Sequence, residues 1–140
     1  MANIKSYRDL ETWQSAMDLV ERCYRMTNRF PKTEQFGLTI QIRRAAVSIP
    51  SNIAEGHNRP SKLAFLNHLG IALGSQAELE TQLELSARLG LAQRVDVEPV
   101  LDLAGQVGRQ LRGLRRALEA GVGGQSPAPS PQPPLPKYAR

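Results

Sequence analysis

Apolar residues recur along the chain at spacings of three and four, in four segments separated by breaks. The breaks are short runs rich in glycine, proline and small polar residues, at positions 30–33, 56–61 and 90–99. The segments lie at about residues 9–29, 34–55, 62–89 and 98–120. This spacing places apolar side chains on one side of a helix, and the strict alternation typical of strands does not persist. The pattern predicts an all-α fold, an antiparallel up-down four-helix bundle.

Three of the segments carry a single apolar stripe that we expect to face the bundle core. In the first segment the stripe consists of Trp13, Met17, Val20, Tyr24 and Thr27. In the third it consists of Phe65, Leu69, Ala72, Gln76, Leu79, Leu83 and Ala87. In the fourth it consists of Val100, Leu103, Val107, Leu111, Leu114 and Leu118. We expect Ser61 to cap the third helix, Pro99 to lie in the first turn of the fourth, and Gly121 to follow its last turn.

The second segment carries two apolar stripes on nearly opposite sides. One contains Phe36, Ile40, Val47 and Ala54, and the other contains Leu38, Ile42, Ala45, Ile49 and Ile53. A helix that is apolar on two sides is buried on two sides, and a bundle of four helices covers one of them. A second subunit is the simplest cover for the other side, so the pattern predicts self-association.

Two arginines, Arg43 and Arg44, lie inside this apolar segment. A buried charge is unfavourable without a partner. We expect the partner to be an acid of the second or third segment, within a subunit or across an interface: Glu55, Glu78, Glu80 or Glu84. The candidates for an oligomer interface or a buried network are therefore Arg43, Arg44, Ile42, Ile49 and Ile53. The alternative is that the two arginines line a basic functional site of the assembly.

Composition changes after residue 120. The 140-residue chain has a formal net charge of +5, and all 13 acidic residues lie before that point. Six of the ten prolines fall between Pro127 and Pro136. Such a segment cannot bury a core and is typical of an extended tail, with a proline-rich ligand motif at 131–134 as the alternative. We predict a bundle domain at 1–120 and a Gly/Pro-rich flexible tail at 121–140.

Arginine stripes lie on the first and fourth predicted helices, away from the apolar stripe. The first stripe consists of Arg22, Arg25 and Arg29, and the second consists of Arg109, Arg112 and Arg116, with Arg115 nearby. Guanidinium groups suit bidentate contacts to phosphate and stacking on bases, so these arginines are candidates for nucleic-acid binding.

The alternative is that both arginine stripes are ordinary solvated surfaces. On the first helix, Asp18 and Glu21 each precede an arginine by four residues, which is the spacing of a surface ion pair. The fourth helix is less balanced, because no acid lies between Asp102 and Glu119. Nucleic acid or an acidic partner is therefore favoured more by the fourth helix than by the first.

Residues suited to catalysis are sparse. His57, His68 and Cys23 lack the spacing of a metal site, and no phosphate-binding glycine loop or nucleophile motif is present. A single cysteine allows no intramolecular disulfide, and neither a signal peptide nor a membrane-spanning run is recognisable. We expect a cytoplasmic protein that is not an enzyme and has no metal or cofactor.

The most distinctive stretch of the sequence is QIRRAAVSIPSNIAEG, at residues 41–56. It is similar to the signature of the bacterial four-helix bundle proteins encoded in intervening sequences of large-subunit ribosomal RNA genes. LETW at 10–13, the turn at 30–38 and ALGSQAELETQL at 72–83 resemble other parts of that family, so the resemblance covers roughly residues 6–120. It implies a bundle that assembles into a ring, with five subunits favoured. The accessory proteins of diversity-generating retroelements, which are basic rings that bind a reverse transcriptase and RNA, look like relatives.

The arginine stripes and the resemblance favour a non-catalytic oligomeric scaffold. Its basic surfaces would bind nucleic acid, RNA in particular, or a nucleoprotein partner. The expected partners are further copies of the chain and RNA or a nucleic-acid-processing protein, with no membrane. The alternative is a protein–protein interaction or structural hub with no nucleic-acid role, in which the arginines are solvated.

Overall fold

The computed structural model describes residues 4–122, and four long helices make up most of them. They are α1 (Glu11–Thr27), α2 (Leu38–His57), α3 (Lys62–Arg88) and α4 (Arg94–Val122). Two short 3-10 helices, Tyr7–Asp9 and Lys32–Glu34, precede α1 and α2. No strand occurs among the described residues. The predicted tail, apart from its first two residues, lies outside the described range.

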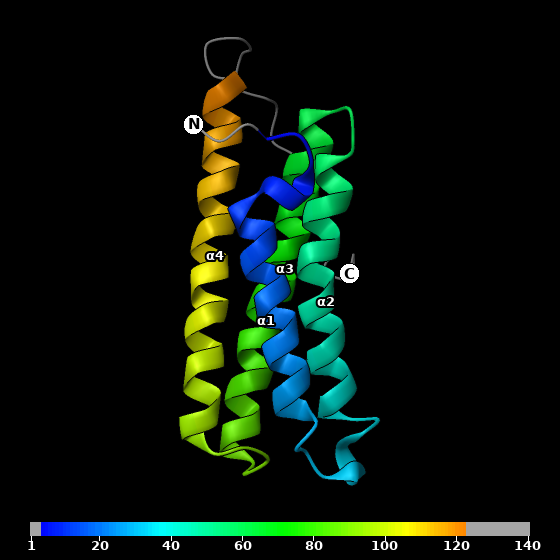
Figure 1. The fold of residues 1–140 in the computed structure, drawn as a ribbon, viewed down its shortest axis with the longest axis vertical. Coiled ribbons are helices and arrows are strands. Elements are labelled where there is room, and N and C mark those ends of the chain that lie inside the picture. Colours follow the sequence, from blue (N-terminus) through cyan, green and yellow to red (C-terminus); the bar gives the residue numbers. More distant parts are fainter. Residues whose placement is uncertain (1–3, 123–140) are drawn as a thin grey trace.

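The four helices form an antiparallel bundle (Figure 1). Each helix packs against the helices next to it in the chain, and α4 returns to pack against α1. Short connections join consecutive helices at alternating ends of the bundle, so consecutive helices run in opposite directions. The predicted all-α four-helix bundle is confirmed.

Each helix contributes fully buried side chains to one central core. Leu19 of α1, Ile49 of α2, Leu69 of α3 and Leu111 of α4 are inaccessible to solvent. Burying a leucine or isoleucine side chain stabilises a fold by about 1.5–3 kcal/mol. The apolar core is therefore the main source of stability for this bundle.

The start of α3 and its buried side follow the sequence pattern closely. The hydroxyl of Ser61, directly before the helix, accepts a hydrogen bond from the amide of Ala64 at 3.1 Å. This cap satisfies one of the amides that a first helical turn leaves free. The predicted stripe lies in the core from Phe65 to Leu83.

The buried stripe of α1 comes one residue earlier in the sequence than predicted. It consists of Thr12, Ala16, Leu19, Cys23, Met26 and Thr27. Trp13 and Val20 are half-buried, whereas Met17 and Tyr24 are exposed. One residue corresponds to about 100° around a helix, so the predicted stripe lies on the flank of α1 that faces α2. At each of the first four predicted positions, the core takes the preceding residue instead.

α2 buries the second of its two predicted stripes. Ile42, Ile49 and Ile53, which are candidates for an oligomer interface or a buried network, are fully buried in the core of their own bundle. Of the other stripe, Val47 is 39% exposed, and Phe36, which lies before the first turn of α2, is 88% exposed. The bundle covers one apolar side of this helix and leaves part of the other side accessible.

α4 starts earlier than predicted and continues further. It begins at Arg94, so Pro99 lies in its second turn and not its first. The amide that Pro99 lacks would have bonded to the carbonyl of Val95, and the exposure of Val95 leaves this part of the helix open to water. At its other end the helix runs through Gly121, which therefore does not terminate it.

α2 and α3 approach each other closely along a seam of small and polar residues. A Cβ atom on Gly56 would lie 2.6 Å from the Cβ atom of His68. Further along, the hydroxyl oxygens of Ser48 and Ser75 are 2.8 Å apart, and Asn52 Oδ1 lies 3.0 Å from His68 Nδ1. We call these five residues the α2–α3 seam. The small and polar residues of the most distinctive stretch thus serve helix packing.

Candidate nucleic-acid interface

Some of the described arginines pair with an acidic side chain four residues earlier in the sequence. Arg25 pairs with Glu21 and Arg59 pairs with Glu55, each at 3.2 Å and with both side chains more than half exposed. Exposed pairs of this spacing contribute about 0.3–0.5 kcal/mol. They partly neutralise the surface without fixing the fold.

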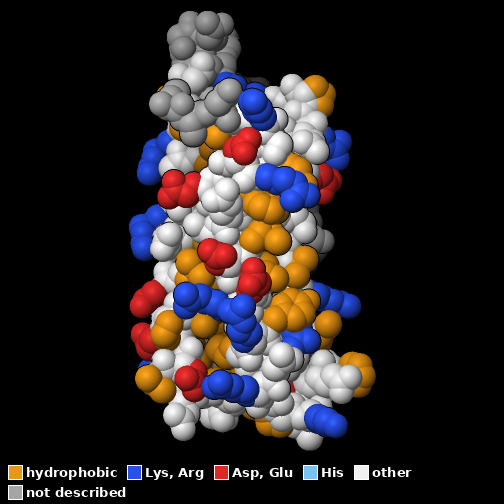
Figure 2. Space-filling model, in the orientation of Figure 1, with side chains coloured by type: hydrophobic (Ala, Val, Ile, Leu, Met, Phe, Trp, Pro, Cys, Tyr) orange, Lys and Arg blue, Asp and Glu red, His pale blue; other side chains and the backbone are white. Residues whose placement is uncertain are grey.

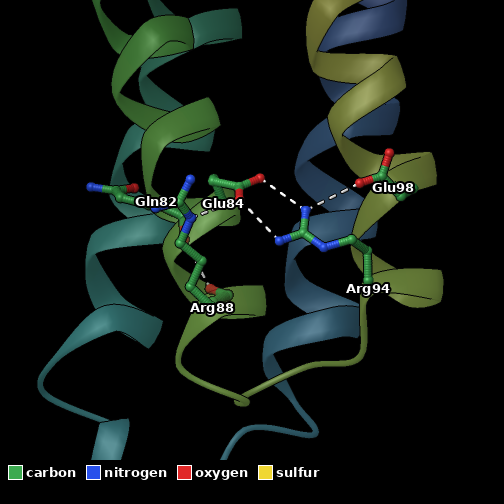
Figure 3. Close-up of polar contacts among 6 residues, drawn as sticks. Gln82, Glu84, Arg88, Arg94 and Glu98 are labelled. Carbon is green, nitrogen blue, oxygen red and sulfur yellow. Dashed lines mark hydrogen bonds and ion pairs between the residues drawn. The ribbon is translucent and has the colours of Figure 1, made fainter.

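The corner between α3 and α4 is fixed by a cluster of ion pairs (Figure 3). Arg94, at the start of α4, bonds both carboxylate oxygens of Glu84 on α3, at 2.9 and 3.0 Å, and bonds Glu98 at 3.3 Å. Arg88 bonds Glu84 at 3.0 Å. The hydrogen bonds from Arg94 and then Arg88 lower the pKa of Glu84 to about 2. Glu84 therefore engages both Arg88 and Arg94.

Arg43 has neutral partners, which corrects the predicted ion pair. Its Nε donates to Thr27 Oγ1 at 2.9 Å, and its Nη2 donates to Asn28 Oδ1 at 3.0 Å. Its guanidinium also lies 4.3 Å from the ring centre of Tyr24. The side chain is half-buried rather than enclosed, so two hydrogen bonds and a cation–π contact satisfy it without an acid. It ties α2 to the end of α1.

Arg44 is exposed, which removes the need for a buried partner. It lines an open hollow of about 540 Å³ between α2 and α3, together with Gln41, Ser48, Ser75 and Glu78. The prediction of a compensating acid rested on burial, and the side chain is not buried.

The arginines of α4 form an exposed basic surface. Arg109, Arg112 and Arg116 are exposed and make no hydrogen bond or ion pair with a described residue. We call these three residues the α4 arginine face. Arg115 differs, because it is half-buried and its buried Nε has no hydrogen-bond partner among the described residues. Three unpaired guanidinium groups within about two helical turns can contact neighbouring phosphates.

The arginines of α1 line an open hollow beside α4. Arg22, Arg25 and Arg29 contribute to this hollow, which has a volume of about 490 Å³ and which we call the α1–α4 hollow. Figure 2 shows basic side chains gathered over the lower half of α1, at its border with α4. Neither Arg22 nor Arg29 makes a hydrogen bond or ion pair with a described residue, so the ion pair expected between Asp18 and Arg22 does not form.

The two arginine sets lie at different levels of the bundle. Because α1 and α4 are antiparallel, the last turns of α1 lie beside the first turns of α4. The α4 arginine face lies around and beyond Gln110, whose amide reaches Glu11 at the start of α1, at 3.4 Å. The structure thus separates two basic surfaces. Gln93 and Asp96 complete the α1–α4 hollow and were missed because the sequence pattern assigned them to a break.

A partly exposed apolar strip runs along the border of α1 and α2. It contains Trp13, Met17, Val20 and Tyr24 of α1. Val47 of α2 belongs to it as well, because it lies one helical turn after Arg43, which contacts Tyr24. Hydrophobic side chains follow this border in Figure 2. We call this strip the α1–α2 apolar edge. α1 therefore carries arginines on one flank of its buried stripe and apolar side chains on the other.

The described part of the chain does not bring nucleophilic or metal-binding groups together. Cys23 is fully buried, and burial raises the pKa of its thiol to about 12, so the thiol stays protonated. His68 belongs to the α2–α3 seam, and His57 packs edge-on against Phe65. No group of three metal-ligating side chains lies within residues 4–122. None of the helices described is long and apolar enough to cross a membrane.

Comparison with known protein families matches residues 8–113 to the family described as 23S rRNA-intervening sequence protein. The match includes α1, α2, α3 and most of α4, and it ends one residue after Arg112. The description refers to an intervening sequence of 23S rRNA and states no activity. No curated protein matches the chain.

Proposed function

The chain belongs to the 23S rRNA-intervening sequence protein family, and from this premise we propose that it is a non-catalytic, oligomeric scaffold that binds structured RNA. The α4 arginine face is the observation that carries the proposal. Its three unpaired guanidinium groups suit several phosphates of one RNA strand, because guanidinium donates paired N–H groups and stacks on bases. Contacts of this kind bind nucleic acid without a strong sequence preference.

The pattern of ion pairs supports RNA binding over simple solvation. Arg25, Arg59, Arg88 and Arg94 each pair with an acid, whereas the α4 arginine face is left without one in the described structure. Unpaired like charges one turn apart on a helix destabilise it slightly. A phosphate partner would offset that repulsion.

We further propose that copies of the chain assemble through the α1–α2 apolar edge. Met17, Tyr24 and Val47 are each more than a third exposed in the single bundle, and a second copy would cover them. The ring of five that the resemblance implies would repeat the α4 arginine face around the assembly. Linked copies raise the effective concentration of every further phosphate contact, which strengthens overall binding.

Fluorescence anisotropy of a labelled, structured RNA at two salt concentrations tests the RNA proposal. We expect binding at low salt that weakens steeply as salt rises, because each phosphate contact releases counterions. The triple variant Arg109→Gln/Arg112→Gln/Arg116→Gln should bind about tenfold more weakly or worse, with a salt slope smaller by about 0.7–0.9 for each phosphate that is no longer neutralised. No binding at low salt, or unchanged binding by this variant, would contradict the proposal.

The triple variant Lys32→Gln/Arg59→Gln/Arg88→Gln is the matched control. It removes the same charge from exposed positions outside the α4 arginine face, two of them already paired with acids. An equal loss of affinity in both triple variants would mean that net charge alone explains binding. A specific protein that still binds after nuclease treatment, and that binds both triple variants, would favour the protein–protein hub.

A further inference from the structure

The α1–α4 hollow combines features that fit one nucleotide, and we infer that it binds a single nucleotide of the RNA through both phosphate and base. The inference rests on the proposed function but concerns a surface separate from the α4 arginine face. It assigns the phosphate to Arg22 and Arg29, the flat face of the base to an apolar floor, and the edge of the base to Asp96 and Gln93.

Arg22 and Arg29 provide the phosphate-binding wall. Both line the hollow and neither is engaged by another described residue, whereas Arg25 between them is paired with Glu21. Arg29 lies just beyond the last residue of α1, and its amide bonds to the carbonyl of Met26 at 3.2 Å, which keeps it against the helix. Two uncommitted guanidinium groups on one wall can hold one phosphate through several charge-assisted hydrogen bonds.

Part of the lining of the hollow is apolar, and we call this part its floor. It is lined by Met26, Leu91, Ala92, Pro99 and Val100. Such side chains cover one face of a base, and a guanidinium plane can stack on the other. The volume of about 490 Å³ lies within the range of about 300–1,000 Å³ typical of small-molecule clefts, which is enough for one nucleotide.

The wall from α4 carries a negative charge. Asp96 lines the same hollow as three arginines, yet its side chain makes no hydrogen bond or ion pair with a described residue. A carboxylate accepts hydrogen bonds from the amino groups of bases and repels a second anion. The hollow therefore suits a ligand with a phosphate at one end and an amino-bearing base at the other. The same carboxylate disfavours an acidic peptide.

The connection that carries this wall is structurally fixed. Gly90 has a φ of 75°, and the amide of Leu91 bonds to the carbonyl of Ser86 at 2.9 Å, the arrangement of a glycine-terminated helix end. Four residues after this glycine, Arg94 is anchored on Glu84 (Figure 3). A wall that is already formed lowers the entropic cost of binding a ligand.

Amide NMR spectra of the full chain, titrated with guanosine monophosphate, uridine monophosphate and inorganic phosphate, test the inference. We expect guanosine monophosphate to perturb residues 22–29 and 90–100. It should bind about fivefold tighter than uridine monophosphate, because guanine offers two neighbouring N–H donors to Asp96 and uracil offers one. Asp96→Asn should bring the two nucleotides to similar affinity.

Variants that remove charge show whether nucleotide binding depends on the arginines of the hollow. Arg22→Gln/Arg29→Gln should weaken guanosine monophosphate binding about tenfold. Lys32→Gln/Arg59→Gln removes the same charge elsewhere and should change binding by less than about twofold. Equal loss in both variants would overturn the inference.

Four further results would also overturn the inference. They are no perturbation by any ligand, perturbation spread beyond the hollow, equal affinity for inorganic phosphate and guanosine monophosphate, and tighter binding of tetraglutamate. If RNA binding still depends on the α4 arginine face in that case, the proposed function stands without the nucleotide site. If guanosine monophosphate binds the hollow but structured RNA does not bind the protein, the proposed function fails and not the nucleotide site.

Discussion

Gly56 sets how closely α2 and α3 can pack near the connection that joins them. A Cβ atom at this position would lie 2.6 Å from Cβ of His68 and 2.9 Å from Cδ1 of Phe65, closer than side chains tolerate. A Cβ atom on Gly74, in the middle of α3, would have no neighbour within 4 Å. The first glycine makes room for another helix, whereas the second only weakens its own.

Substitution of these two glycines should therefore have opposite effects. Gly56→Ala should lower the free energy of unfolding by about 1–3 kcal/mol, because the methyl group forces α2 and α3 apart. Gly74→Ala should raise it by about 0.5–1 kcal/mol, because alanine is the better helix former. Urea unfolding followed by circular dichroism measures both. A Gly56→Ala variant as stable as the native protein would show that the α2–α3 seam tolerates separation.

At the scale of the element, α1 shows how one helix serves three surroundings. Its core stripe includes Leu19, its flank toward α4 carries Arg22, and its flank toward α2 carries Val20. These positions are consecutive or nearly so, and each step turns the helix by about 100°. If the buried stripe were shifted by one residue, different side chains of α1 would face solvent and be available for partners.

The α3–α4 corner depends on a carboxylate whose charged form is favoured by folding. The pKa of Glu84 lies at about 2, below its ordinary value of 4.5, because Arg94 and Arg88 donate hydrogen bonds to the carboxylate. The folded state therefore binds the proton less tightly than the unfolded chain does. The resulting stabilisation is fully present above pH 4.5 and is lost as the pH falls toward 2.

Glu84→Gln should accordingly destabilise the bundle near neutral pH and have a shrinking effect below about pH 4.5. Thermal unfolding of the native protein and of the Glu84→Gln variant, between about pH 2 and pH 8, measures the difference in stability. Glu119→Gln is a suitable control, since Glu119 is exposed on α4 and bonds to no described residue. A destabilisation by Glu84→Gln that stays constant down to about pH 2 would mean that Glu84 acts through packing and not through its charge.

At the scale of the whole molecule, the bundle presents surfaces of different character on different sides. The α1–α2 apolar edge lies on one side of α1, and the α1–α4 hollow lies on the other (Figure 2). The α4 arginine face lies further along the bundle. If copies assemble through the apolar edge, both basic surfaces remain free for a phosphate-bearing partner.

Assembly through the α1–α2 apolar edge makes a prediction about mass in solution. The native chain should be an oligomer by light scattering, and Met17→Lys/Val47→Lys should shift it to monomer, because charged groups there are costly to bury. The matched control is Leu89→Lys/Val95→Lys, at the α3–α4 connection. These two apolar residues are more exposed than Met17 and Val47, and their substitution should leave the oligomer intact. A monomeric native chain, or dissociation only in the control, would refute this interface.

The sequence predicted the helical elements more reliably than their surroundings. Ser61 was recognised as a cap because capping is a local hydrogen bond, and it is one in the structure. The sequence pattern places the start of α4 four residues late, because proline favours the first turn of a helix whereas Pro99 lies in the second turn. The distinctive stretch at 41–56 pointed to the family that the match over residues 8–113 shows.

Four amphipathic segments, the breaks between them and the family stretch were readable from the sequence alone, since helix periodicity and turn chemistry act between residues close in the chain. Only the tertiary structure decided that Ala16 and Cys23 enter the core while Met17 and Tyr24 remain outside, because burial depends on how four helices pack together. For the same reason, the sequence did not predict the α1–α4 hollow or the neutral partners of Arg43. Both join residues of different helices, and their geometry exists only once those helices are in place.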